Sequence, residues 1–424
     1  MGLNQKTIDR PASADIGAAD LHEAFNPEVR SQVFQTVIGT VQQRLFDPSL
    51  NGKDWDRLVA SRSDRVLNAA TADEFVEEVR ALVTELELHP LDFFQEQRAT
   101  APFHRIARAT LYRHQDRWML QDVHLDGPAD RNGLVPGDQV TAINGTAVHP
   151  PAPVSVPAGN TLSLSVLKRG GATAEVVLNP QGPAERKGTR YVSASKPESD
   201  LGLLKITMFP GLVGVDMAAA IDKAIAELAG CNRLIIDLRG NPGGGSANLR
   251  LMSCMTPQKI PVGYSLTRPR AQTGYRREDL PQFRRIPSNK FALIWLALRF
   301  KWVDKSIVVV TEGLGQQSFR GKIVLLVNEH TTSGSEIVAG FAREHKLATI
   351  VGSRTAGRLL GWSSLPVGHG FRLTLPVSNY ITWSGRCFEN SGIEPDIEEP
   401  FQPELALAGR DGQLEAAIRV ARSL

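Results

Sequence analysis

The first hundred residues place apolar side chains at helical spacing. Residues 27–46 follow this period, and residues 75–86 form a second apolar stripe along one helix face. The residues before them, 1–20, are polar and rich in alanine and glycine. The pattern predicts a flexible tail over 1–20 and a mostly helical domain over 21–104.

The second of these helices has recognisable end signals. Thr71 and Glu74 form the pattern of a capping box at its start. Helices usually end before a proline, so the sequence predicts that this helix extends to the region of His89 and Pro90.

Over residues 105–182 the period changes to that of short strands. Residues 161–167 and 174–178 alternate between apolar and polar side chains. Upstream of them, residues 127–145 contain glycine-rich turns and a strand that ends in Asn-Gly. This region is predicted to be a small β domain.

From residue 195 to the end, strands and helices alternate. Buried strands are predicted at 234–238 and 323–327, and an alanine-rich helix at 215–228. Alternation of this kind indicates a largely parallel sheet. The fold class is therefore multidomain α/β, with the core over 195–424.

An insert at 262–305 interrupts the alternation. It is rich in arginine and then becomes apolar and aromatic over 289–303. A segment of this length inside a compact domain often has a function of its own. A lid, an oligomer contact, a membrane-surface helix and a helix packed on the domain's own core all fit the sequence.

Composition narrows the classes of function. The 48 basic and 45 acidic residues give a net charge of +3, and no basic stripe with interleaved aromatics indicates nucleic-acid binding. No window is long enough to predict a membrane span, and no signal peptide is visible. Three scattered cysteines fit a reducing compartment, so we expect a cytoplasmic protein. Without metal-binding motifs, we expect neither a metal nor another cofactor.

The first candidate site is the serine loop, residues 328–333, which joins a predicted strand to a helix. Ser333 would lie just before the first helical turn, where unpaired backbone amides and the helix dipole favour a developing oxyanion. The alternative is that Ser333 is only an N-cap, with Glu336 completing a capping box.

The second candidate is the glycine loop, residues 237–245, with the sequence DLRGNPGGG. Its glycines allow close approach of the backbone to a ligand and can present amides to an anion. Nucleotide binding is the competing interpretation, but the lysine and hydroxyl that follow a phosphate-binding loop are missing.

Together these motifs resemble a known family. The segments LIIDLRGNPGG, VNEHTTSGSEIVAG and VGSRTAG, with GLVPGDQVTAING upstream, resemble the carboxyl-terminal processing peptidases, also called tail-specific proteases. The resemblance implies a crotonase/ClpP-like core with an inserted PDZ-like domain over 105–182. It also implies Ser333 as nucleophile, with oxyanion donors from Gly334 and from Gly243 or Gly244.

One position departs from the common family pattern. Many members carry a lysine base where this chain has Arg358, and arginine stays protonated at physiological pH. The tricorn core protease branch, which this chain resembles at LFDPSLNGKDWDRL and ENSGIEPDIE, uses a histidine and a glutamate. The matching residues are His89 as the base and Glu389, which would orient it. His330 is a rival base and Ser335 a rival nucleophile.

The sequence thus predicts a serine peptidase acting on peptides or unfolded proteins, in which the resemblance allows homo-oligomers. The acidic side chains Glu394, Asp396 and Glu398 could favour basic substrates. Two alternatives remain: an inactive homologue that binds peptides through its PDZ-like domain, and another acyl-transfer or isomerising reaction on the same fold.

Overall fold

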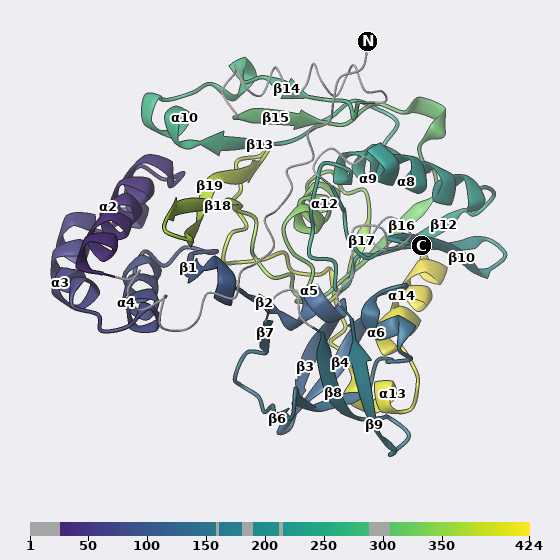
Figure 1. Ribbon diagram of the computed structural model, residues 1–424. Helices are drawn as coiled ribbons and strands as arrows, with labels where there is room; N and C mark the ends of the chain where they lie inside the picture. The colour runs from purple at the N-terminus through teal and green to yellow at the C-terminus, as the bar shows by residue number, and fades with distance from the viewer. Residues whose placement is uncertain (1–25, 158–160, 180–189, 212–214, 288–305) are drawn as a thin grey trace, which may run out of the picture. The chain divides into compact units, whose positions relative to one another are not determined.

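The computed structural model describes residues 26–157, 161–179, 190–211, 215–287 and 306–424 (Figure 1). Two compact units make up the chain. The first consists of residues 1–97 and 363–375, and the second of residues 98–362 and 376–424. The predicted tail over 1–20 lies outside the described residues.

The first unit is mainly helical, as the period of its apolar positions predicts. Its helices are α2 (Pro27–Arg44), α3 (Trp55–Leu67) and α4 (Ala72–Thr84). The short strand β1 (Asp92–Gln95) pairs antiparallel with residues 371–374 of β19. Stacking between Phe93 and Phe371, with centroids 5.5 Å apart, closes the core beside α4.

The predicted end of α4 is wrong. The helix stops at Thr84, five residues before His89. The chain then turns so that Leu86 is fully buried, and Glu87 takes the left-handed conformation with φ 54°. The burial of Leu86 determines where α4 ends, and Pro90 lies beyond that point. The start is as predicted, since the Thr71 side chain accepts from Glu74 N at 3.1 Å.

A largely parallel sheet forms the centre of the second unit, which confirms the prediction from alternating elements. Its order is β10-β11-β12-β16-β17-β20, and only β10 is antiparallel to its neighbour. The strands are β10 (Val192–Glu198), β11 (Leu201–Ile206), β12 (Arg233–Asp237), β16 (Lys322–Val327), β17 (Thr349–Gly352) and β20 (Ile397–Glu398).

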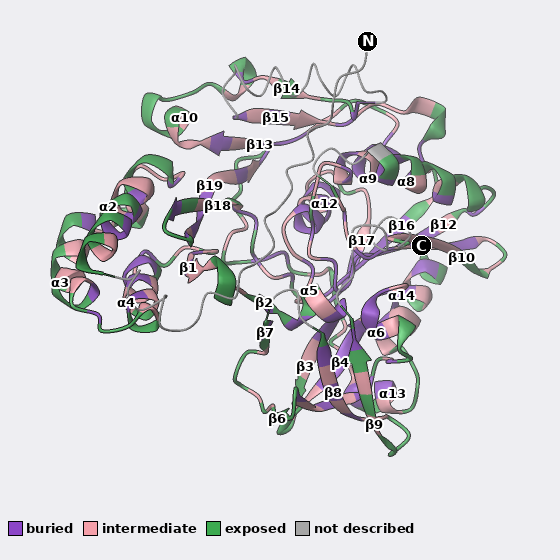
Figure 2. Ribbon diagram, viewed as in Figure 1, coloured by how far each residue is buried: buried purple, intermediate pink, exposed green. Residues whose placement is uncertain are grey.

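Helices cover both faces of this sheet (Figure 1). Ile236 and its alternate neighbours pack against α8 (Val215–Glu227), α9 (Asn248–Cys254) and α12 (Gly334–Glu344). Ile235 points to the opposite face and packs against α14 (Gly412–Ser423). Because both faces are covered, most residues of the central strands β12 and β16 are buried and apolar, and Figure 2 shows buried residues along the central strands.

A second, antiparallel sheet in this unit is built from residues 109–178. Its strands are β3 (Ala109–His114), β4 (Arg117–Val123), β5 (Gln139–Ile143), β6 (Thr146–Ala147), β8 (Leu162–Leu167) and β9 (Thr173–Leu178). They enclose a core of their own with α5 (Phe103–Ala107) and the single turn α6 (Pro128–Arg131). At the β5–β6 turn, Asn144 and Gly145 both have positive φ, as an Asn-Gly hairpin requires.

The segment at 262–305 begins with regular structure. It contributes β13 (Pro261–Thr267), α10 (Arg268–Thr273) and β14 (Gln282–Phe283). Strand β13 pairs antiparallel with β15 (Ile307–Val310) and with residues 378–382 of β19 (Phe371–Thr382). The apolar run over 289–303 lies outside the described residues.

The remaining elements are short or peripheral: β2 (Thr100–Pro102), β7 (Ser155–Pro157), β18 (Gly361–Gly368) and α13 (Pro403–Leu407). In the part of the chain that the structure describes, no helix has the length and apolar character needed to cross a bilayer.

Candidate active site

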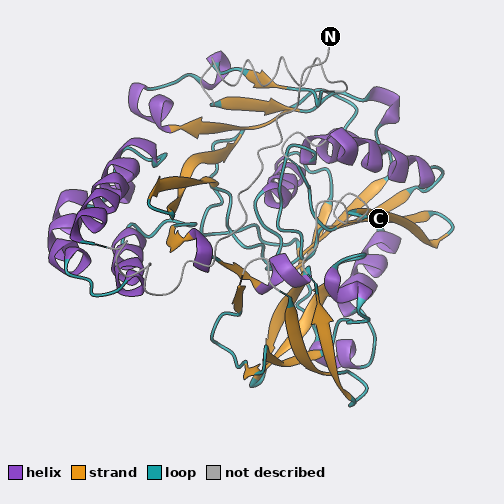
Figure 3. Cartoon of the chain, viewed as in Figure 1, coloured by secondary structure: helices purple, strands orange, loops and turns teal. Residues whose placement is uncertain are grey.

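Ser333 lies in the turn that joins β16 to α12. Figure 3 distinguishes the helices, strands and loops of the chain by colour. Its backbone has φ 54° and ψ −119°, a conformation that residues other than glycine adopt at a cost of about 1–3 kcal/mol and mainly at functional sites. An ordinary N-cap residue is extended, as Thr71 is with φ −131°. The capping box with Glu336 that the N-cap alternative predicts is present, but an N-cap role alone leaves the backbone conformation of Ser333 unexplained.

Backbone contacts hold this strained turn. Ser333 N donates to Arg358 O at 3.1 Å and to the Glu336 carboxylate at 3.0 Å. Glu336 is fully buried and also accepts from Gly357 N at 2.7 Å and Arg358 N at 2.8 Å. Burial raises the pKa of Glu336, and these hydrogen bonds partly oppose the rise. The turn is thus fixed before any substrate binds.

The glycine loop packs directly against Ser333. A Cβ atom on Gly243 would lie 2.8 Å from Ser333 Cβ and 2.6 Å from Gly334 N. A Cβ on Gly244 would lie 2.0 Å from Phe209 O. Both glycines have positive φ, 80° and 127°. Only glycine meets the steric and backbone requirements of these two positions.

The amides of the glycine loop differ in their partners. Gly243 N donates to Asn241 Oδ1 at 2.8 Å, and Gly245 N donates to Phe209 O at 2.8 Å. Among the described residues, neither Gly244 N nor Gly334 N has a hydrogen-bond partner. A Cβ on Gly334 would lie 3.6 Å from Gly244 N, so the two unpaired amides are neighbours.

Glu389 is tied to the chain segment that follows Arg358. Its Oε2 accepts from Leu359 N at 2.6 Å and Leu360 N at 3.1 Å. Its Oε1 is buried and accepts no hydrogen bond from any described residue. Burial raises the pKa of Glu389, the two backbone donors lower it, and the charge of Glu336 raises it further. Residues 358–360 therefore contact both Ser333 and Glu389.

The structure also describes the surroundings of the rival residues Ser335 and His330 and of Arg358. Ser335 is fully buried on α12, and its hydroxyl has no partner in the described part of the chain. His330 is half-buried, and its backbone amide donates to Asn328 Oδ1 at 3.1 Å. The Arg358 side chain is exposed, so the contact with Ser333 comes from its carbonyl alone.

His89 belongs to the first unit, in the turn between α4 and β1, and its side chain is exposed. Its role as base stays a prediction. His104, which no sequence motif singled out, lies on α5 in the same unit as Ser333. Burial, followed by the charges of His330, Arg105 and Arg358, lowers the pKa of His104 to about 4.

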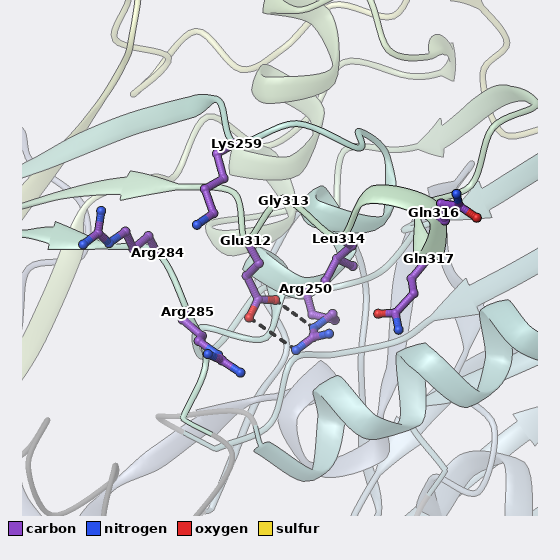
Figure 4. Close-up of a pocket in the computed structure, with 9 residues that line it drawn as sticks. All are labelled: Arg250, Lys259, Arg284, Arg285, Glu312, Gly313, Leu314, Gln316 and Gln317. Carbon is purple, nitrogen blue, oxygen red and sulfur yellow. Dashed lines mark hydrogen bonds and ion pairs between the residues drawn. The ribbon is translucent and has the colours of Figure 1, made fainter.

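A cavity of about 820 Å³ lies elsewhere in the second unit, and Figure 4 shows its lining. Arg250 and Glu312 form its centre, with Arg250 Nε 2.8 Å from the Glu312 carboxylate. Asp222 also pairs with Arg250, at 3.3 Å. The lining contains the basic residues Arg250, Lys259, Arg284 and Arg285, and the two carboxylates offset half of their charge. Ser333 is not among the lining residues.

Two predicted acidic substrate contacts already have partners. Glu394 pairs with Arg354, and Asp396 pairs with Arg343 at 3.0 Å. Within the described ranges, no group of three or more His, Cys, Asp or Glu side chains could hold a metal ion.

Comparison with known proteins shows which proteins this chain is similar to. Residues 200–399 match the model of peptidase family S41. The carboxyl-terminal-processing protease of Synechocystis sp. is 25% identical over 302 residues, covering 69% of this chain and 62% of that protein. Tricorn protease homolog 1 of Streptomyces coelicolor is 25% identical over 417 residues, covering 92% of this chain and 35% of that protein. The chain thus spans less than two thirds of these relatives' length.

Among solved structures, the photosystem II D1 C-terminal processing protease superposes with a TM-score of 0.58 at 18% identity. The match covers 92% of this chain and 97% of that one. This likeness confirms the mixed α/β fold. The part of the chain that is similar to peptidase family S41, residues 200–399, includes Ser333, the glycine loop and Glu389.

Proposed function

We propose that this chain is a serine peptidase that hydrolyses peptide bonds through an acyl-enzyme on Ser333. The observation that carries the proposal is the pair of neighbouring, unpaired amides, Gly244 N and Gly334 N, beside a strained serine at a helix N-terminus. Ser333 Oγ attacks the substrate carbonyl, the amine leaves with a proton, and water then hydrolyses the ester.

The two amides stabilise the oxyanion of the tetrahedral intermediate. Removing one such donor typically lowers kcat by about 10²–10³-fold. We assign Gly244 rather than Gly243, because the amide of Gly243 is engaged by the Asn241 side chain. Gly243 then serves as the packing surface that sets the distance between the two loops.

His89 is the proposed general base, and Glu389 orients it. The buried, unpartnered Oε1 of Glu389 needs a donor, and an imidazole N–H is a suitable one. Arg358, at the position where many family members have a lysine, cannot take a proton.

The proposal includes a crotonase/ClpP-like core and a PDZ-like domain. The parallel sheet with helices on both faces supports a crotonase/ClpP-like core. The antiparallel sheet of residues 109–178, with its own core, supports a PDZ-like domain that binds the substrate peptide. Relatives named for carboxyl-terminal processing support substrates that are extended chain ends or unfolded segments.

Hydrolysis of casein by four proteins tests the proposal. Wild type should cleave, Ser333→Ala and His89→Ala should lose at least about 100-fold in rate, and Arg358→Ala should retain activity. A fluorophosphonate probe should label wild type and not Ser333→Ala. Absence of both cleavage and labelling in wild type would favour a peptide-binding homologue without catalysis.

A further inference from the structure

Asn328, at the carboxyl end of β16, joins the two loops of the site. Its Oδ1 accepts from Gly240 N at 3.0 Å and from His330 N at 3.1 Å. Gly240 belongs to the glycine loop and His330 to the serine loop. Asn328 is fully buried, so no water replaces these bonds at low cost. One amide oxygen therefore fixes both loops just before the segments that supply the unpaired amides.

The orientation of this amide is set from a distant part of the chain. Asn328 Nδ2 donates to Asp122 Oδ2 at 2.9 Å, and Asp122 comes from β4. The same carboxylate oxygen accepts from Thr110 Oγ1 at 2.7 Å, and Asp122 N donates to that hydroxyl at 3.1 Å. If the Asn328 amide flipped, its NH₂ group would face two N–H donors and its oxygen would face a carboxylate.

The backbone leaves little space for adjustment at this point. Gly240 has φ 69°, and a Cβ atom there would lie 2.9 Å from Asp122 Cβ and 2.8 Å from His124 Nε2. Asp122 is 5% exposed. The end of β4 is thus packed against the glycine loop, and Asp122 is held from three sides.

We propose that Asp122 is a positioning residue for the active site: by fixing the Asn328 amide, it holds the serine and glycine loops in the register that brings Gly334 N and Gly244 N together. The kinetic part of this inference rests on the proposed peptidase function. Asp122 acts through Asn328 and does not touch the substrate.

Gln121 provides a matched control. It precedes Asp122 on β4, is equally buried, and donates through Nε2 to the side chain of Glu329 in the same serine loop at 2.9 Å. Gln121→Ala removes a bond of similar length between the same two elements and leaves the Asn328 amide untouched. A loss of activity that merely reflects weaker docking of β4 will appear in both variants.

The first experiment compares kcat and KM of wild type and five variants on a fluorogenic peptide from the casein digest. Asp122→Ala should lower kcat about 10-fold or more with KM within about 3-fold. Asp122→Asn keeps an acceptor oxygen and should have most of the wild-type kcat. The kcat of Gln121→Ala should stay near that of wild type. In the Asn328→Ala background, Asp122→Ala should cause no further loss. Equal losses in Asp122→Ala and Gln121→Ala would overturn the proposal.

A second measurement does not depend on catalysis. Hydrogen exchange of the Gly240 and His330 amides should accelerate about 10-fold or more in Asp122→Ala and remain unchanged in Gln121→Ala. If wild type neither cleaves nor labels, the peptidase function fails while this result still decides the role of Asp122. Unchanged exchange in Asp122→Ala refutes the positioning role even in an active enzyme.

Discussion

The contact between Gly243 and Ser333 gives the sharpest test of the site geometry. In Gly243→Ala, the new methyl group would lie 2.6 Å from Gly334 N, 2.7 Å from Thr332 O and 2.8 Å from Ser333 Cβ. Carbon contacts need about 3.5 Å or more, so the two loops must separate by about 0.7–0.9 Å. The oxyanion amides sit on opposite sides of this separation.

A misplacement of about 1 Å in an active site lowers the rate about 100-fold, which corresponds to about 2.7 kcal/mol of transition-state stabilisation. We therefore expect kcat/KM of Gly243→Ala to fall by roughly this factor. The substitution also forces alanine into a left-handed conformation, which costs about 1–2 kcal/mol of folding free energy. The kinetic effect must be separated from this second one.

Gly230 is the control for backbone strain. Its φ of 86° nearly equals the 80° of Gly243, and nothing lies within 4 Å of a Cβ placed there. Gly230→Ala should have the same backbone penalty and full activity. The assay is peptide hydrolysis well below the midpoint of thermal unfolding, with the folded fraction checked by circular dichroism. If the two variants agree in kcat/KM within about 3-fold, Gly243 does not set the loop distance.

Three further substitutions test individual groups. Glu389→Gln keeps an acceptor for the backbone donors but loses the charge, so kcat should fall at least about 100-fold. Because burial raises the pKa of Glu389, wild-type activity should be lost on acidification at a pH above the ordinary glutamate range. Activity that is lost only below about pH 4.3 would contradict this expectation. Ser335→Ala removes a buried, unpartnered hydroxyl, so activity and probe labelling should persist without loss of thermal stability, and lost labelling would restore Ser335 as nucleophile. Burial opposes ionisation of Asp237, but Arg239 and Lys205 outweigh it and lower its pKa to about 2; its stabilisation is therefore present above the unfolded pKa of about 3.9 and lost as pH falls toward 2. Asp237→Asn should be less stable than wild type at neutral pH, and its urea midpoint should change less with pH between about 4 and 2. If the urea midpoints of wild type and variant change with pH in parallel, the assignment of the low pKa to Asp237 is refuted.

The parallel sheet was predictable because its strands are buried on both faces. An apolar run at 234–238, interrupted by Asp237, and a continuous one at 323–327 predict such strands, which occur at Arg233–Asp237 and Lys322–Val327. The place of Ser333 was predictable for the same reason, since a polar loop between a buried strand and a helix is a local pattern. These features depend only on neighbours in the sequence.

Features decided by distant contacts were not predictable. The end of α4 depends on where Leu86 is buried, and the proline signal near His89 was misleading. The choice between Gly243 and Gly244 depends on the Asn241 side chain, whose Nδ2 also bonds Ile206 O. No local pattern indicates the burial of Leu86 or the bond to Ile206 O, whereas the bond from Gly243 N to Asn241, two residues away, is local.

The link between Asp122 and Asn328 spans 206 positions. The sequence does contain one signal for it: Gln121 and Asp122 are consecutive polar residues next to the apolar pair Met119 and Leu120, and all four are buried. Two adjacent buried polar side chains at a strand end need partners from another element. Such a pair indicates an interface without identifying the partner.

Buried side chains that accept hydrogen bonds from backbone amides occur several times around Ser333. Three fully buried side chains, Asn241, Asn328 and Glu336, each accept hydrogen bonds from backbone amides of the serine loop, the glycine loop or both. Donors fixed in this way need no reorganisation when charge develops on the substrate, which is the condition for effective oxyanion stabilisation. All three side chains belong to the second unit, whereas the proposed base belongs to the first. Loss of the base should therefore lower the rate at which Ser333 reacts while leaving the hydrogen-exchange protection of both loops unchanged.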